Sequence, residues 1–221
     1  MAPMKVHHFR EEKETIYNLI KVKKIPYTII DLGWWYQLSI PSIPTGRGSK
    51  AIFAPFNTIF GQGERKIALI HRLDIGKFIA RILNDGRTLN KYVFCYGDLL
   101  TQREIINTME EKSNEKAITN TISEVELAAG IDQQLAKLEL NPSDTEALFT
   151  LTGLRYGMSL GIRGDNCPEN AKYLGYLNAR ELYPDLHPMK FSDFLADVLE
   201  DKVDAVYRGG ILDRVQLRQR Q

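Results

Sequence analysis

The sequence predicts an α/β fold, with part of a parallel sheet at the front of the chain and a mostly helical region behind it. Two observations carry this prediction. An amphipathic segment, residues 11–24, runs directly into an unbroken β-branched and aromatic segment, Tyr27 to Leu32. A helix that feeds a buried strand is half of a βαβ unit. The second half of the chain instead carries helix-start signals and apolar residues at helical spacing.

The first helix is expected over Glu11–Lys24. Ile16, Leu19 and Ile20 fall on one side of it, with lysines and glutamates around the rest. A helix of this kind packs its apolar side against the core. Pro26 ends it, because the residue before a proline is pushed out of the helical region.

The later elements follow from local signals. Asp74 is expected to cap a helix from Ile75 to about Leu83. Two capping-box spacings, Thr101 with Glu104 and Ser143 with Glu146, predict helices to about residues 111 and 160. The remaining expected elements are helices at Glu124–Leu138, Pro168–Tyr183 and Phe191–Leu199, and short strands at Ala51–Phe53, Lys66–His71 and Lys91–Tyr96, with a turn at Gly61-Gln62-Gly63.

The charge balance and the cysteine content exclude several classes. The 29 basic and 28 acidic side chains nearly cancel, so no field of one sign steers the chain to nucleic acid or an anionic membrane. The basic tail from Arg208 is too short and unpatterned to change this. Cys95 and Cys167 are too few and too distant for a disulfide framework or a zinc site.

The sequence also predicts the cellular compartment and whether the chain crosses a membrane. The polar N-terminus is unlike a signal peptide. No apolar run approaches the roughly 20 residues that span a bilayer. The sequence therefore predicts a cytoplasmic protein with a small-molecule substrate, no nucleic-acid or membrane partner, and no metal.

The segment after the first strand is the main candidate site. Residues 33–37 are aromatic, and ligands of open α/β sheets bind beyond the carboxyl ends of the strands. Trp34 and Trp35 can line a pocket there or belong to the core, and the residues alone leave both open.

For the other chemically reactive residues, the sequence favours structural roles. His71 is isolated, and Cys95 lies in an expected strand as a small buried group. Arg163, Asp165 and Asn166 form a polar loop before a helix. A capped turn is the expected role of this loop, with a substrate contact as the alternative.

A series of motifs resembles one enzyme family. Lys13 follows Phe9 by four residues and precedes Ile25-Pro26-Tyr27-Thr28 by twelve. In this order and spacing the chain resembles the NmrA-like, isoflavone-reductase-like family, most of all its fungal members. The further motifs that carry the likeness are Gly61-x-Gly63, Asp74-Ile75-Gly76, Arg87-Thr88-Leu89-Asn90, Arg163-Gly164-Asp165-Asn166, Ala171-Lys172-Tyr173-Leu174-Gly175-Tyr176 and Leu182-Tyr183-Pro184-Asp185.

The resemblance implies a Rossmann-type NAD(P)-binding fold with a substrate-binding lobe, using NADPH. Residues 1–40 would be the end of the Rossmann domain, and residues 41–221 the substrate-binding region with returning strands of the sheet. Lys13 matches a lysine that handles a proton or orients the substrate beside the nicotinamide. The segment that borders the cofactor maps onto Trp35, Tyr36, Gln37 and Leu38.

One departure from the family concerns the phosphate end of the cofactor. The family begins with a strand and a G-x-x-G-x-x-G turn that binds the pyrophosphate. These 221 residues contain no such turn, since Gly46-Arg47-Gly48 and Gly61-Gln62-Gly63 each lack the third glycine and the strand-turn-helix context. A truncated gene model, a late start codon or a degenerate paralogue would each account for this.

Three functions are therefore open at this point. The resemblance favours an NAD(P)H-dependent reductase of a small aromatic or polyketide-like secondary metabolite. The alternatives are a non-catalytic, NmrA-type regulator with a protein partner and a non-redox cyclase or isomerase that uses the same pocket.

Overall fold

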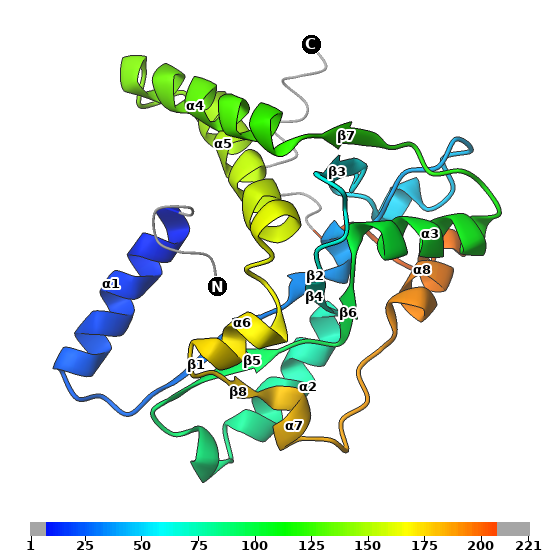
Figure 1. Cartoon of the computed structure of the whole chain (residues 1–221). Coiled ribbons are helices and arrows are strands. Elements are labelled where there is room, and N and C mark those ends of the chain that lie inside the picture. Colours follow the sequence, from blue (N-terminus) through cyan, green and yellow to red (C-terminus); the bar gives the residue numbers. More distant parts are fainter. Residues whose placement is uncertain (1–7, 207–221) are drawn as a thin grey trace.

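Two small sheets lie at the centre of the molecule and a third lies towards its edge, in a computed structural model that describes residues 8–206 (Figure 1). The first sheet has the order β1-β5-β8, and both of its strand pairs are parallel. In the second, β2 runs parallel and β6 antiparallel to β4. The third pairs β3 with β7 in parallel. The strands are β1 Thr28–Leu32, β2 Trp34–Trp35, β3 Thr58–Phe60, β4 Ile67–Ile70, β5 Lys91–Cys95, β6 Asp98–Leu100, β7 Asn120–Ile122 and β8 Leu177–Asn178.

Helices surround these sheets and confirm the α/β class. α2 packs beside the first sheet, while α3 and α8 pack together beside the second. α4 and α5 form a hairpin that projects from the body (Figure 1). The helices are α1 His8–Val22, α2 Arg72–Ile82, α3 Gln102–Ser113, α4 Glu124–Leu140, α5 Thr145–Gly157, α6 Pro168–Tyr173, α7 Ala179–Leu182 and α8 Phe191–Leu199. Among the described helices, none combines the length and apolar character needed to cross a bilayer.

The central strand β4 joins the packed layers. All four of its residues are buried. Ile67 and Leu69 belong to the cluster around Tyr36 and Phe191, whereas Ile70 belongs to the cluster under α2. Each such aliphatic side chain stabilises the fold by about 1.5–3 kcal/mol through burial.

Two carboxylates fasten the segment that leads into α8. Asp74 accepts a hydrogen bond from the backbone N–H of Met189 at 2.9 Å. Asp98 accepts one from the N–H of Phe191 at 2.7 Å and a second from the Lys190 ammonium at 2.9 Å. The Phe191 N–H is one of the unpaired donors at a helix N-terminus, so Asp98 caps α8 from a distant strand.

Several expected helix limits are confirmed and others are wrong. The Thr101–Glu104 box is present, with both hydrogen bonds formed. The start of α5 is capped by Asp144 and not by Ser143, because the Asp144 carboxylate accepts from the N–H of Ala147 at 2.9 Å. The helix also ends earlier, at Gly157, where it passes into the π-helix η5 (Met158–Arg163).

Asp74 does not cap the N-terminus of α2 as expected. α2 begins at Arg72, three residues before the expected start at Ile75, with His71 at the cap position. The Asp74 side chain is buried and holds Lys77 and the Met189 backbone instead. The Asp74 carboxylate therefore binds the backbone of Met189, more than a hundred residues away, although the local sequence predicts that it caps the helix.

Two more expected elements differ. The helix expected over Pro168–Tyr183 is divided into α6, β8 and α7, because Gly175 turns the chain at φ +81°. The strand expected at Ala51–Phe53 is replaced by the 3-10 helix η3 (Ser49–Ala51). The basic tail from Arg208 lies outside the described residues.

The first helix docks through a different face from the one expected. Tyr17 packs edge-on against Tyr92 of β5 with ring centroids 6.1 Å apart. Ile16 and Leu19, expected in the core, are 57% and 56% exposed. α1 stands at the margin of the molecule, with no described element on its outer side (Figure 1).

Candidate functional site

The candidate site begins where the chain passes from one sheet to another at Gly33. Its N–H donates to the carbonyl of Cys95 at 2.8 Å, which continues the β1–β5 pairing, and the next two residues are β2 of the second sheet. A Cβ at Gly33 would lie 2.8 Å from the carbonyl oxygen of Ala68. Only glycine allows this close approach of two strands.

The two tryptophans that follow occupy different surroundings. The Trp34 indole N–H donates to the Leu38 carbonyl at 3.3 Å, and its ring centroid lies 5.0 Å from that of Tyr156 on α5. Trp35 is half-buried and packs against the cluster under α2. Trp34 and Tyr156 therefore form an aromatic pair against the core around Tyr36, and Trp35 packs against the core under α2.

The 3-10 helix η2 (Tyr36–Leu38) lies deeper than its neighbours. Tyr36 is fully buried, with its hydroxyl 2.9 Å from the Met189 carbonyl and 3.1 Å from the Asp98 carboxylate. Burial and the adjacent Asp98 charge raise the pKa of Tyr36 well above its ordinary value. A phenol with a raised pKa is a poor proton donor, so Tyr36 serves here as a support of the site.

Gln37 has unused hydrogen-bonding capacity. It is 2% exposed, and neither atom of its amide has a partner among the described residues. An unpaired buried polar group costs about 1–3 kcal/mol, so each such group in a native protein calls for an explanation. Leu38 beside it is half-buried.

Lys13 lies on α1, away from this segment in the described contacts. Its side chain is exposed and forms no hydrogen bond or ion pair within residues 8–206. Tyr17, one turn further on, is a packing residue, as its contact with Tyr92 shows. The structure thus brings together the residues from Trp34 to Leu38, and it leaves Lys13 on the outside.

A half-buried ion pair holds the N-terminal part of α1. Arg10 donates to the Asp31 carboxylate at 2.9 Å and to the Tyr176 hydroxyl at 3.1 Å, and this hydroxyl donates to Asp31 at 2.6 Å. Burial alone would raise the pKa of Asp31, but the Tyr176 hydrogen bond and the Arg10 charge outweigh it and lower the pKa. Sequence patterns gave no sign of this contact, because its three members come from α1, β1 and the loop before β8.

The polar loop before α6 has a structural role. Asp165 is buried and accepts from the Ser159 hydroxyl and the Arg163 guanidinium, both at 3.0 Å. Asn166 exchanges two hydrogen bonds with the backbone of Ala68, at 2.8 and 3.1 Å. These contacts fasten the π-helix to β4, which agrees with the expected turn.

His71 and Cys95 are also structural. The His71 ring lies among aromatic rings, 6.0 Å from Tyr36 and 5.5 Å from Phe194, and its pKa is lowered chiefly by burial. Burial raises the pKa of Cys95 to about 12, which makes its thiol unreactive. Within residues 8–206, no group of three or more histidine, cysteine or acidic side chains could hold a metal ion.

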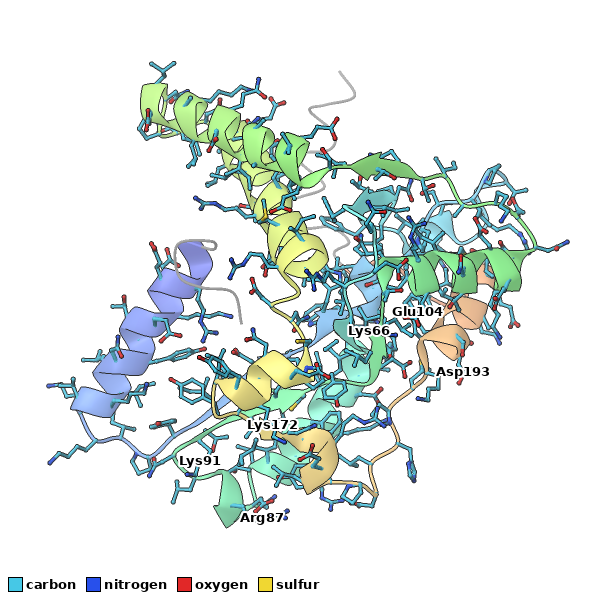
Figure 2. The ribbon with its side chains drawn as sticks, in the orientation of Figure 1. Lys66, Arg87, Lys91, Glu104, Lys172 and Asp193 are labelled. Carbon is cyan, nitrogen blue, oxygen red and sulfur yellow. The ribbon has the colours of Figure 1, made fainter. Side chains whose placement is uncertain are left out.

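A pocket of about 470 Å³ lies at the free edge of β8. Its floor includes Phe94 and Tyr176, and its rim carries Lys172, labelled on α6 in Figure 2, together with Glu169 and Glu181. The pocket has both charges at its rim, and it is separate from the segment of Trp34 to Leu38.

Comparison with known proteins bears on the family resemblance. The chain is 38% identical over 199 residues to asnovolin J 5′,6′-dehydrogenase of Aspergillus novofumigatus, and the alignment covers 88% of this chain and 60% of that protein. The expected resemblance to the isoflavone-reductase-like family is confirmed. It spans about 60% of the length of the relatives it matches, corresponding to their C-terminal part. No protein-family model matches it.

Solved structures of the isoflavone-reductase-like family agree with the fold. The chain aligns with isoflavone reductase at a TM-score of 0.66 and 26% identity, over 88% of this chain and 60% of that one. It aligns with leucoanthocyanidin reductase of Vitis vinifera, solved with NADPH, at a TM-score of 0.66 and 21% identity, over 86% and 58% of the two chains. The expected likeness to part of a Rossmann-type enzyme is therefore confirmed.

The residues present suit one end of NADPH. The unpaired amide of Gln37, directly beyond β2, matches the hydrogen-bonding needs of a nicotinamide carboxamide. A pyrophosphate needs a cluster of backbone N–H donors at a helix N-terminus, and the sequence of the 221 residues has no glycine-rich turn to supply it. The fit is thus to the nicotinamide end alone.

Proposed function

We propose that this chain forms the substrate-side part of an NADPH-dependent oxidoreductase that acts on a small aromatic or polyketide-like secondary metabolite. The observation that carries the proposal is the 38% identity with a fungal dehydrogenase across 88% of the chain. The aromatic pair of Trp34 and Tyr156, whose ring centroids are 5.0 Å apart, supports it because aromatic side chains provide large contact areas for such substrates.

The proposal divides the chain into two parts. Residues 1–40 would belong to the nucleotide-binding domain and residues 41–221 to the substrate-binding region. β5 pairs with β1, and β8 pairs with β5 in the same sheet, so β5 and β8 would be the strands that return to that domain.

In this proposal the cofactor supplies or accepts a hydride at the nicotinamide ring. Trp35, Gln37 and Leu38 would border that ring, with Gln37 donating to and accepting from its carboxamide. Tyr36 would hold η2 in place through its hydrogen bonds to Met189 and Asp98.

Lys13 would handle the proton or orient the substrate. Its ammonium is free of any ion pair within residues 8–206, so it is available to a substrate oxygen. A positioned lysine can give up or take a proton in the transition state, an effect worth about 10²–10⁴-fold in rate.

Turnover of NADPH tests the proposal. The protein, assayed with aromatic ketone and enone substrates, should oxidise NADPH. Lys13→Ala should reduce turnover by at least about a hundredfold, with unchanged unfolding, whereas Lys23→Ala, also exposed near the end of the same helix, should not. Equal turnover in both variants would remove Lys13 from the mechanism. NADPH binding without any turnover would favour a sensor over an enzyme.

The proposal includes a cytoplasmic location. Cys95 and Cys167 are both free thiols, and free thiols persist in reducing compartments. Fractionation of cells that express the protein should recover it with the cytosol, and recovery in a secreted fraction would refute this.

A further inference from the structure

A protruding aromatic side chain lies next to the pocket at the free edge of β8. Tyr173, at the end of α6, is 86% exposed, and Leu174 after it is 49% exposed. The residue before Tyr173 is Lys172, which lines the rim of the β8 pocket (Figure 2). Large apolar side chains that are exposed together mark surfaces that bind another molecule. We call this surface, made of α6, β8 and α7, the β8 face.

A well-ordered turn of the backbone presents Tyr173 to the outside. The N–H of Leu174 donates to the Asn170 carbonyl at 3.1 Å. The N–H of Gly175 donates to the Lys172 carbonyl at 3.0 Å, and Gly175 itself turns the chain towards β8 at φ +81°. A tyrosine on a fixed backbone has only two side-chain torsions to restrict when it binds, so its contact area comes at a low cost in conformational entropy.

The strand beside the pocket has an open edge. In the described part of the chain, β8 is the end strand of its sheet and pairs only with β5, with α6 and α7 on either side of it in sequence (Figure 1). An edge strand can pair with a strand of another chain, but β8 has only two residues and offers few backbone groups. A stable contact on the β8 face therefore needs side chains, which the pocket and Tyr173 can supply.

The β8 pocket suits an aromatic side chain. Its volume of about 470 Å³ lies in the range that holds a small organic ligand, so a single phenol ring fits within it. Aromatic rings in contact contribute about 0.5–1.5 kcal/mol beyond the burial of their area. Glu169 also lines the pocket and can accept a hydrogen bond from a phenol hydroxyl. The apolar residues that line the pocket are Phe94, Ala171, Tyr176, Leu177 and Leu182.

The charges at the rim of the pocket are complementary about a two-fold axis. Lys172 on α6 precedes β8, whereas Glu181 on α7 follows it. Within residues 8–206 the Lys172 ammonium forms no ion pair. Two edge strands related by a two-fold axis run antiparallel, so the segment before the strand in one copy lies beside the segment after it in the other. Lys172 of each copy would then meet Glu181 of the partner subunit.

We infer that the β8 face binds a second copy of this chain, with Tyr173 of each copy in the β8 pocket of the other and the two β8 strands paired antiparallel. A two-fold contact requires a surface that complements itself. The β8 face meets this requirement because it carries an aromatic side chain with a pocket and a cation with an anion. A partner of another sequence would have to bring all four groups, whereas a second copy brings them by symmetry.

Sedimentation equilibrium of the 221-residue chain tests this surface. We expect a reversible equilibrium between monomer and dimer that shifts with protein concentration. Tyr173→Ser should raise the dissociation constant of the dimer by at least about tenfold, because it removes the side chain that fills the pocket. The same variant should leave urea unfolding of the monomer unchanged, since the side chain is 86% exposed. The amides of Leu177–Asn178 should exchange more slowly in the dimer than in the monomer.

Charge reversal tests the antiparallel arrangement. Lys172→Glu and Glu181→Lys should each weaken the dimer, because each brings like charges together across the axis. The double variant Lys172→Glu/Glu181→Lys should restore it. Urea unfolding is measured for each variant, since Glu181 also accepts a hydrogen bond from the Asn178 amide at 3.1 Å.

Two exposed apolar residues outside the β8 face provide matched controls. Leu140 is 90% exposed at the end of α4, and Ile16 is 57% exposed on α1. Leu140→Ser and Ile16→Glu should dimerise as the unaltered chain does, because neither residue lies on α6, β8 or α7.

Several results would overturn the inference. A chain that stays monomeric at every concentration measured would exclude the dimer. A dimer that is unchanged in Tyr173→Ser, or that is lost in Ile16→Glu, would use a surface other than the β8 face. A double charge reversal that fails to restore the dimer would contradict the antiparallel arrangement and with it the inference.

Discussion

Asp31→Asn should destabilise the protein by removing the charge that neutralises Arg10. The two side chains are only 13% and 17% exposed, and the substituted amide would keep the shape while the guanidinium lost its charged partner. Breaking one side of a fully buried pair costs about 3–5 kcal/mol. Because Glu14 remains 2.7 Å from Arg10, we expect about 2–3 kcal/mol here, or a fall in Tm of about 5–10 °C for a chain of this length.

Urea unfolding of the variant measures this loss directly. Asp185→Asn is the control, because its ion pair with Arg81 is exposed on both sides and such pairs contribute about 0–1 kcal/mol. Arg10→Met/Asp31→Leu should recover part of the stability lost in Asp31→Asn, since it removes both charges of this pair and leaves only Glu14, which is 20% exposed, without its partner. Equal losses of stability in Asp31→Asn and Asp185→Asn would contradict this expectation, and so would a double variant less stable than Asp31→Asn.

Two further predictions concern the same region. The folded-state pKa of Asp31 is lowered, so its contribution should be complete above the unfolded value of about 3.9 and be lost as the pH falls through the folded-state value. Stability measured against pH should therefore decline less steeply on the acid side in Asp31→Asn, and parallel curves would contradict this. Gly33→Ala should cost about 1–3 kcal/mol in urea, because its Cβ would lie 2.8 Å from a backbone oxygen. Gly86→Ala, with nothing within 4 Å of the added atom, is its control, and equal losses would refute the close approach.

Elements with strong local signals could be predicted from the sequence. The Thr101–Glu104 box and the apolar spacing of Phe191–Leu199 each depend on residues within one or two turns, and both helices form as expected. The docked face of α1 could not be predicted in this way. Its amphipathic pattern indicates where an apolar face lies, whereas its contacts are made by Arg10 and Tyr17 on the opposite side.

Asp74 shows the limit of local reasoning about polar residues. A carboxylate near a helix start usually caps that helix, but here the Met189 N–H and the Lys77 ammonium take it. Which donors a carboxylate binds depends on the packing of distant segments, and a local sequence pattern does not contain that information.

The sequence predicted the location of the candidate segment, Trp34 to Leu38, but not the surroundings of its side chains. The position of Trp34 to Leu38 after a strand indicated where a ligand would lie, and the family resemblance gave the same segment. The complete burial of Tyr36 depends on contacts with α8 and β6, and the unpaired amide of Gln37 is likewise visible only in three dimensions. The roles of Lys13 and the cofactor-binding residues remain predictions.

The cap that Asp98 places on α8 bears on the order of folding. Its partners, Tyr36, Lys190 and Phe191, lie 62, 92 and 93 residues away along the chain. Contacts between such distant residues close large loops and form slowly. The α4–α5 hairpin, whose helices are neighbours in sequence, can assemble early, whereas α8 gains its cap only after the second sheet exists. The docking of α8 should therefore be among the last steps by which this chain reaches its native state.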